Sequence, residues 1–159
     1  MPLLLLTGAA AAQGLCAAGE TVFLACQVAG KDGAGNTARW INLCGNPPQS
    51  LQYRFGRAGK IELQYPPDAA HGVQKFWFAH YMRLQTDRVE IRFRQRGTEY
   101  ILFDYLEEGN QRQTGVRITT PGGSEHELSC ADHVTTRLRD LKPVLRCDAD
   151  SALNLGGCP

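Results

Sequence analysis

The sequence lacks most of the signatures that identify an enzyme or a cofactor-binding protein. None of its four histidines stands in an H-x-x-x-H or H-E-x-x-H arrangement, and no G-x-S-x-G, Walker loop or G-x-G-x-x-G fingerprint occurs. None of the six cysteines shows C-x-x-C spacing, which argues against a zinc site and against a thioredoxin-type redox centre. We therefore expect no catalytic residues, no metal ion and no cofactor.

The chain also has little net charge. Its formal charge is +1 over 159 residues, so it exerts no general attraction on nucleic acid or on anionic lipid. Hydrophobic residues make up 43% and charged residues 21%, proportions that are close to those of an ordinary globular domain. The composition thus indicates one folded domain and excludes nucleic acid as a partner.

No apolar run is long enough to cross a bilayer as a helix, although the chain begins with one that resembles an export signal. Residues 1–19 start apolar and continue into alanine, with small residues at Ala17, Ala18 and Gly19, as at a signal cleavage site. No Lys or Arg precedes Leu3, which departs from the usual signal, and a buried N-terminal helix is the alternative. We predict a signal peptide over 1–19, a single β-rich domain over 20–159, and a periplasmic or secreted protein.

An exported protein meets an oxidising compartment, so its cysteines are expected to pair. Removal of a signal peptide over residues 1–19 takes Cys16 with it and leaves five cysteines, an odd number. We predict two disulfides, one between Cys26 and Cys44 across the first hairpin and one between Cys147 and Cys158 in the tail. A bond between Cys130 and Cys147 is the main alternative.

Alternation of apolar and polar residues with period two predicts strands along most of the chain. The fold class that follows is mainly β, a single antiparallel sandwich or barrel of 7–8 strands with one short C-terminal helix, braced by disulfides. The expected strands and hairpins cover 20–30, 38–45, 51–55, 61–65, 73–85, 88–105 and 116–130, and the expected helix covers 131–141.

The most regular stretch is the hairpin "LQYRFGRAGKIELQYP" at 51–66. Folding it about 56–60 would place Phe55 opposite Ile61, Tyr53 opposite Leu63 and Arg54 opposite Glu62, each a favourable cross-strand pair. The tip "GRAGK" is not explained by this pairing, and we interpret its two cations as a candidate contact.

A second candidate is the row of arginines on one strand face in "RVEIRFRQRGTEY", where guanidinium groups would grip an acidic partner or an anionic glycan. The alternative is a solvated face balanced by Glu90 and by Glu99, which stands beside Arg94. Together the candidate binding residues are Arg54, Arg57, Lys60, Arg92, Arg94, Arg96 and Tyr100.

These motifs resemble a group of small exported bacterial proteins. The shared features are a C-x17-C pair, a Y-x-F-G-x-x-G-K-x-E-L hairpin and a later aromatic hairpin, here "GTEYILFDY", followed by "LSC". The resemblance covers most of 20–130 and implies export and a β-rich fold. More distantly the chain is similar to periplasmic lysozyme inhibitors and immunity proteins, although Arg96 stands in "RGTEY" where the inhibitor loop has serine.

We therefore expect a non-enzymatic binding module of the cell envelope, an inhibitor or immunity-type protein whose partner is an envelope or secreted protein. One alternative is an envelope hydrolase that uses His80 or the acids near Asp104. The other is a structural or assembly factor of the envelope. The sequence does not determine the oligomeric state.

Overall fold

The computed structural model describes residues 14–28 and 38–159, and it is mainly β. The ten strands are β1 (Thr21–Val28), β2 (Trp40–Gly45), β3 (Gln52–Arg57), β4 (Lys60–Tyr65), β5 (Trp77–Arg83), β6 (Thr86–Gln95), β7 (Thr98–Glu107), β8 (Gln111–Thr119), β9 (Glu125–Thr136) and β10 (Arg146–Cys147). Four short 3-10 helices lie between or after them: η2 (Ala69–Lys75), η3 (Glu108–Asn110), η4 (Leu138–Leu141) and η5 (Ala152–Asn154).

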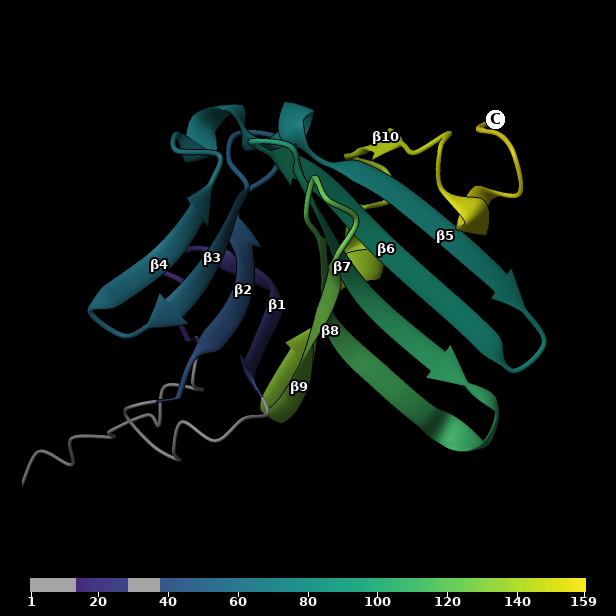
Figure 1. Ribbon diagram of the computed structural model, residues 1–159, viewed down its shortest axis with the longest axis horizontal. Coiled ribbons are helices and arrows are strands. Elements are labelled where there is room, and N and C mark those ends of the chain that lie inside the picture. Colours follow the sequence, from purple (N-terminus) through teal and green to yellow (C-terminus); the bar gives the residue numbers. More distant parts are fainter. Residues whose placement is uncertain (1–13, 29–37) are drawn as a thin grey trace, which may run out of the picture.

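All ten strands belong to one sheet that curls into a half-barrel (Figure 1). The strand order is β10-β5-β6-β7-β8-β9-β1-β2-β3-β4. Every neighbouring pair is antiparallel except β10 and β5, which are parallel. The chain thus places β4 at one margin of the sheet and the short β10, beside β5, at the other.

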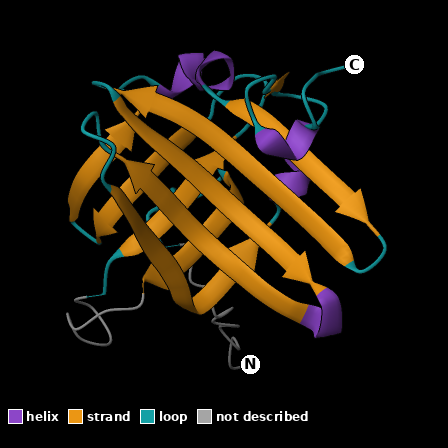
Figure 2. Ribbon diagram, turned by 45° about the vertical axis from the view of Figure 1, so that its right-hand side comes forward, coloured by secondary structure: helices purple, strands orange, loops and turns teal. Residues whose placement is uncertain are grey.

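The two halves of the sheet meet at β9 and β1: the first residues of β9 pair with β8, and its last residues pair with β1. The register of β1 shifts once against β2, between Val22 and Leu24, and twice against β9, between Ala25 and Val28. Each extra residue of this kind bends a strand and increases its twist. Side chains of β3 and β4 meet those of β6 across the interior, where Tyr53 and Tyr65 contact Phe93. Figure 2 shows the curl of the sheet.

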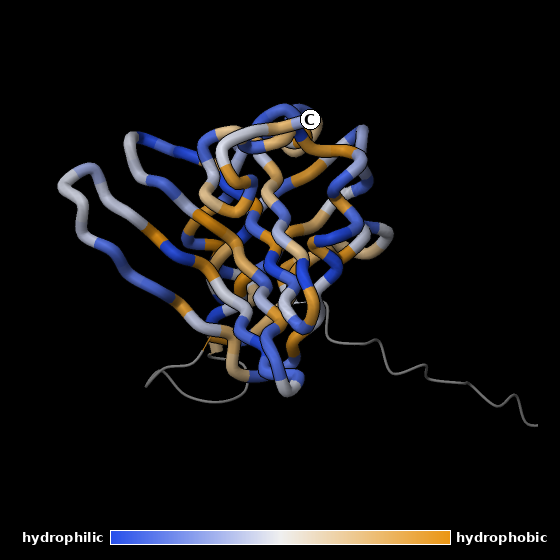
Figure 3. Tube along the Cα trace, turned by 90° about the vertical axis from the view of Figure 1, so that its right-hand side faces the viewer, coloured by the Kyte–Doolittle hydropathy of each residue, from blue (hydrophilic) through white to orange (hydrophobic). Residues whose placement is uncertain are grey.

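The interior of the half-barrel is filled by apolar side chains. Figure 3 shows hydrophobic residues, in orange, alternating with hydrophilic ones, in blue, along the strands. Tyr65 of β4 stacks on Phe93 of β6 with ring centres 4.6 Å apart, and Phe93 stacks on Tyr100 of β7 at 4.7 Å. Leu138 and Leu141 of η4 are fully buried against the same core. Aromatic stacking and η4 thus hold together two walls that share no backbone hydrogen bonds.

The predicted fold class is confirmed in its coarse form and wrong in detail. The protein is mainly β, but its described residues form ten strands in one curled sheet, a half-barrel, and not the predicted sandwich or barrel of 7–8 strands. The helix predicted over 131–141 is wrong, because β9 pairs with β1 as far as Thr136 and leaves Val134 43% exposed. The spacing of Val134, Leu138 and Leu141 predicted this helix, but only Leu138 and Leu141 are buried, in the 3-10 helix η4.

The predicted register of the β3–β4 hairpin is also wrong. Phe55 pairs with Leu63 and Arg54 with Gln64, because the turn is tighter than expected and a bulge lies between Phe55 and Gly56. Gly56 has φ 142°, and a Cβ there would lie 2.5 Å from the carbonyl oxygen of Lys60. Only glycine fits this position. The two-residue turn and the one-residue bulge together move the register by two residues from the predicted one, so the same residues face inward.

The other hairpin predictions are partly confirmed. Arg94 pairs with Glu99 across the turn at 96–97, as expected. The strand predicted over 73–85 is shorter, because η2 occupies its first residues as far as Lys75 and β5 starts at Trp77.

All six cysteines are paired. The bonds are Cys16–Cys44, Cys26–Cys130 and Cys147–Cys158. The predicted tail disulfide is present, whereas the predicted Cys26–Cys44 bond is wrong, because Cys26 faces the core from β1 and meets Cys130 of the neighbouring β9. Three disulfides fit an oxidising compartment. Within the described residues, no helix has the length and apolar character needed to cross a bilayer.

The disulfides should differ in what they contribute to stability, because the loops they close differ in length. Cys26 and Cys130 are 104 residues apart and Cys147 and Cys158 are 11 apart. Loop-closure entropy then predicts a loss of about 5 kcal/mol for the C26A/C130A variant and about 3 kcal/mol for C147A/C158A. Urea unfolding measures both, and a larger loss in C147A/C158A would contradict the account.

Candidate binding surface

Three of the seven candidate residues, Arg54, Arg92 and Arg94, form ion pairs with carboxylates of the protein itself. Arg54 on β3 donates from Nη1 and Nη2 to Glu20 at 2.6 and 2.9 Å, and from Nε to the Gln52 amide oxygen at 2.8 Å. Burial alone would raise the pKa of Glu20, but the hydrogen bonds from Arg54 and from the Ala17 N–H outweigh it and hold that pKa below its usual value. Arg54 therefore fastens the segment before β1 to the sheet.

The segment that Arg54 fastens begins before the predicted cleavage site. Arg54 also donates to the Leu15 carbonyl at 3.2 Å, and the Leu15 N–H donates to the Asn42 side chain at 3.0 Å. Cys16 is bonded to Cys44 of β2. Residues 14–20 are thus part of the fold, although a cut at 18–19 would remove Cys16.

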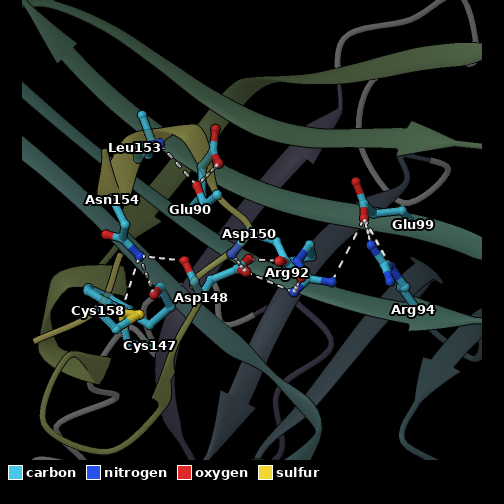
Figure 4. Close-up of polar contacts among 12 residues, drawn as sticks. Glu90, Arg92, Arg94, Glu99, Cys147, Asp148, Asp150, Leu153, Asn154 and Cys158 are labelled. Carbon is cyan, nitrogen blue, oxygen red and sulfur yellow. Dashed lines mark hydrogen bonds and ion pairs between the residues drawn. A yellow bond between two sulfur atoms is a disulfide. The ribbon is translucent and has the colours of Figure 1, made fainter. Parts of the chain in front are cut away.

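Arg92 on β6 is the second of these ion-paired residues, and its partner Asp148 lies in the C-terminal tail. It is 8% exposed and makes two hydrogen bonds to Asp148, at 2.6 and 2.8 Å, as Figure 4 shows. Trp77 lies between β10 and β6, with Arg146 4.3 Å and Arg92 5.0 Å from its ring centre. This Arg–Trp–Arg contact and the Asp148 pair fix the tail to the outer face of the sheet.

The same tail covers the edge of β5. Asn154 accepts a hydrogen bond from the His80 N–H at 3.2 Å and donates to the Phe78 carbonyl at 3.5 Å, and the Asp148 N–H donates to that carbonyl at 2.8 Å. One asparagine side chain therefore replaces part of a neighbouring strand, and the Cys147–Cys158 disulfide closes the loop that carries it (Figure 4). This edge of the sheet is closed from Trp77 to His80.

The predicted arginine row is balanced by carboxylates. Arg88 donates to Glu107 at 2.5 Å, and Arg94 donates to Glu99 at 2.9 and 3.0 Å. A hollow of about 380 Å³ beside the tail brings together three guanidinium groups and four carboxylates. Its lining residues include Glu90, Arg92, Arg94, Glu99, Arg117, Asp148 and Asp150. Because these charges nearly cancel, the hollow has no strong preference for an anion.

The remaining candidates lie at hairpin ends or in the core. Tyr100 is half-buried in the aromatic stack with Phe93, and burial raises its pKa. Arg96 lies in the β6–β7 turn with φ 51°. A Cβ on its neighbour Gly97 would lie 3.1 Å from Pro121, which belongs to the β8–β9 turn. Those two turns therefore support each other.

Arg57 and Lys60 flank the β3–β4 turn and pair directly across it. The turn itself, Ala58 and Gly59, is exposed, as is Lys60. Figure 1 shows this turn at the left margin of the molecule, away from the β6–β7 turn at the top. The seven candidates thus do not form one surface: the hairpin tip with Arg57 and Lys60 stands apart from the others.

A polar network that the sequence only suggested lies at the opposite end of the core. Asp104 of β7 is fully buried and accepts hydrogen bonds from Arg112 and Thr114 of β8, Thr136 of β9 and Arg139 of η4. Burial by itself would raise the pKa of Asp104, but the bonds from these partners outweigh it and lower that pKa to about 2. The signal for this network is a charged residue at an inward position in the alternation Tyr100, Leu102, Asp104.

The network continues to His80. Arg139 also donates to Asp87 of β6 at 2.6 Å, and Asp87 lies 2.7 Å from the Nε2 atom of His80. Burial opposes the ionisation of Asp87, yet hydrogen bonds from Arg139 and His80 lower its pKa. Each acid here is bound to structural partners, and among the described residues no group of His, Cys, Asp or Glu side chains has an arrangement that would hold a metal ion.

Comparisons of the chain with protein-family models, with curated proteins and with solved structures found no match. The contacts of the residues themselves are therefore what a functional proposal has to rest on.

The low pKa of Asp104 predicts how stability depends on pH. A carboxyl whose pKa falls from 3.8 to about 2 on folding stabilises the native state above pH 4, and this contribution is lost as the pH falls through 2. The contribution at neutral pH is about 2 kcal/mol. Urea unfolding should show that Asp104→Asn costs about 3–5 kcal/mol at pH 7, with a gap to the wild type that narrows by about 2 kcal/mol at pH 2.

The matched control is Glu108→Gln at an exposed acid in η3, which should change stability by less than about 0.5 kcal/mol. An Asp104→Asn variant with the same pH dependence as the wild type would contradict the role of Asp104.

Proposed function

We propose that this protein is a non-catalytic binding module of an oxidising compartment, and that the β3–β4 hairpin is its contact element. The observation that carries the proposal is the contrast between the candidate cations. Arg54, Arg92 and Arg94 hold the protein's own carboxylates, whereas the hairpin tip projects with Lys60 exposed. A rigid projecting hairpin is a suitable element for insertion into a partner's cleft.

The charge of the tip indicates the class of partner. Residues 52–61 contain three basic residues and no Asp or Glu. Arg54 is paired with Glu20, and Lys60 places an exposed positive charge beside the turn. Complementary charge raises the association rate and selects against basic partners. The partner that this surface favours is an acidic protein of the same compartment, which is compatible with an inhibitor or immunity-type function.

The alternative of an envelope hydrolase gains no support from the contacts of His80 and Asp104. His80 is bound to Asp87, and both oxygens of Asp104 accept hydrogen bonds from arginine. A carboxylate with a pKa of about 2 is a poor general acid or base at neutral pH. The contacts of these residues favour a role in holding η4 and β9 to the sheet.

Charge reversal at the tip tests the proposal. Immobilised wild-type protein should retain acidic proteins from an extract of its own compartment at low salt, and R57E/K60E should lose them, because like charges then face each other. K75E/K142E changes the net charge equally at exposed sites away from the hairpin and should bind as the wild type does. Mass spectrometry of the retained proteins compares the three columns.

Retention that is equal on R57E/K60E and on the wild type would contradict the role of the hairpin. Loss on both double variants would show that only net charge matters, and would also contradict it.

We further propose that any export signal is removed before Gly14. Leu15 and Cys16 are hydrogen-bonded and disulfide-bonded to the domain, and small residues suited to cleavage also occur at 9–12. The intact mass of the exported, non-reduced protein should correspond to a chain that keeps Cys16 and has three disulfides. A mass that corresponds to a start at residue 19 or 20, with one unpaired cysteine, would contradict this proposal.

A further inference from the structure

The two edges of the sheet differ in how far other parts of the described chain cover them. The β5 margin is closed by β10, by the Asn154 side chain and by the tail that Arg92 holds. At the other margin, no strand among the described residues pairs with β4 on its outer side. A strand in that position directs every second N–H and C=O away from its neighbour, where an added strand can bind them.

The side chains of β4 are also open on both faces. Lys60, Glu62 and Gln64 are exposed on one face, and Ile61 on the other face is 45% exposed. Leu63 and Tyr65, on the Ile61 face, are half-buried against the core. An added strand would therefore meet apolar side chains on one face and charged or polar side chains on the other.

We propose that the outer edge of β4 binds an extended acidic segment of a partner protein, which adds an eleventh strand to the sheet. This inference rests on the proposed function and names the form of its partner. The segment alternates apolar residues, which pack beside Ile61 and Leu63, with polar ones. It carries an acid at the end next to Lys60, where the tip is positive.

The charges on β4 favour an added strand of complementary charge, in addition to discouraging unspecific pairing. Charged side chains on an edge strand discourage unspecific pairing. Glu62 is within 4.0 Å of Arg39, so its charge is already balanced, whereas Lys60 faces solvent. A segment with glutamate near Lys60 gains an ion pair across the strands, and one with lysine there meets like charge.

The test uses a fluorescent, capped octapeptide that alternates valine with threonine and carries glutamate at both ends, so that either strand direction brings an acid to Lys60. Its binding to the full-length protein is followed by fluorescence anisotropy. A matched peptide has lysine at both ends and should bind at least about tenfold more weakly. The K60E variant should reverse this preference.

Backbone methylation separates strand addition from side-chain contact. In an added strand only every second amide donates to β4. Two peptides are therefore compared, one N-methylated at the odd-numbered amides and one at the even-numbered amides. The peptide whose methylated amides point toward β4 should lose binding, and the other should keep it. Equal binding in both phases, or no saturable binding of the glutamate peptide, would overturn the proposal. Light scattering that shows a dimer dissociating as the peptide binds would instead assign the edge to a second copy of this chain.

The outcomes separate this inference from the proposed function. If the peptides do not bind while R57E/K60E still loses the acidic proteins that the wild type retains, the edge is not the site and the binding module stands. If both experiments fail, both proposals are wrong.

Discussion

A sheet that curls without closing keeps two edge strands, and the rest of this structure depends on whether each edge strand is covered by other parts of the chain. An exposed edge offers unpaired backbone groups to other chains, so proteins usually cover or blunt it. Here the C-terminal residues cover one edge by three means: a two-residue parallel strand, an asparagine that mimics a strand, and a buried Arg92–Asp148 pair. The strand β4 is left without such a cover among the described residues. The proposed binding site is therefore the β4 edge, which the described residues leave uncovered.

The half-barrel also has to keep its two walls together without a closing ladder of hydrogen bonds. The stack of Tyr65, Phe93 and Tyr100 does this in the upper part of the core. At the other end Asp104 binds groups from β8, β9 and η4 at once. A buried carboxylate is costly unless its oxygens are satisfied, and here four side chains satisfy them. An enzymatic function would use the same acids and His80, and their contacts give that alternative no support.

The sequence predicted the local features of the fold and missed those set by contacts between distant segments. Period-two alternation located most strands, and the Arg96-Gly97 dipeptide located a turn, because both signals depend on neighbouring residues alone. The Cys26–Cys130 bond joins residues 104 apart, and nothing in the spacing indicates that β9 lies beside β1. The spacing of Val134, Leu138 and Leu141 fits a helix as well as a strand that ends in a 3-10 turn. Pairing with β1 decided between the two.

Contacts between distant segments also limited what the sequence could indicate about the candidate binding residues. The cations of the β3–β4 tip were visible in the sequence, whereas the partners of Arg54 and Arg92 lie 34 and 56 residues away. That β4 is an edge strand follows only from the strand order. Amide hydrogen exchange of the native protein tests this central claim most directly. The His80 amide, bound to Asn154, should exchange slowly, and alternate amides of β4 should exchange as fast as those of an exposed loop. Protection of every β4 amide to the level of its neighbour β3 would contradict the open edge.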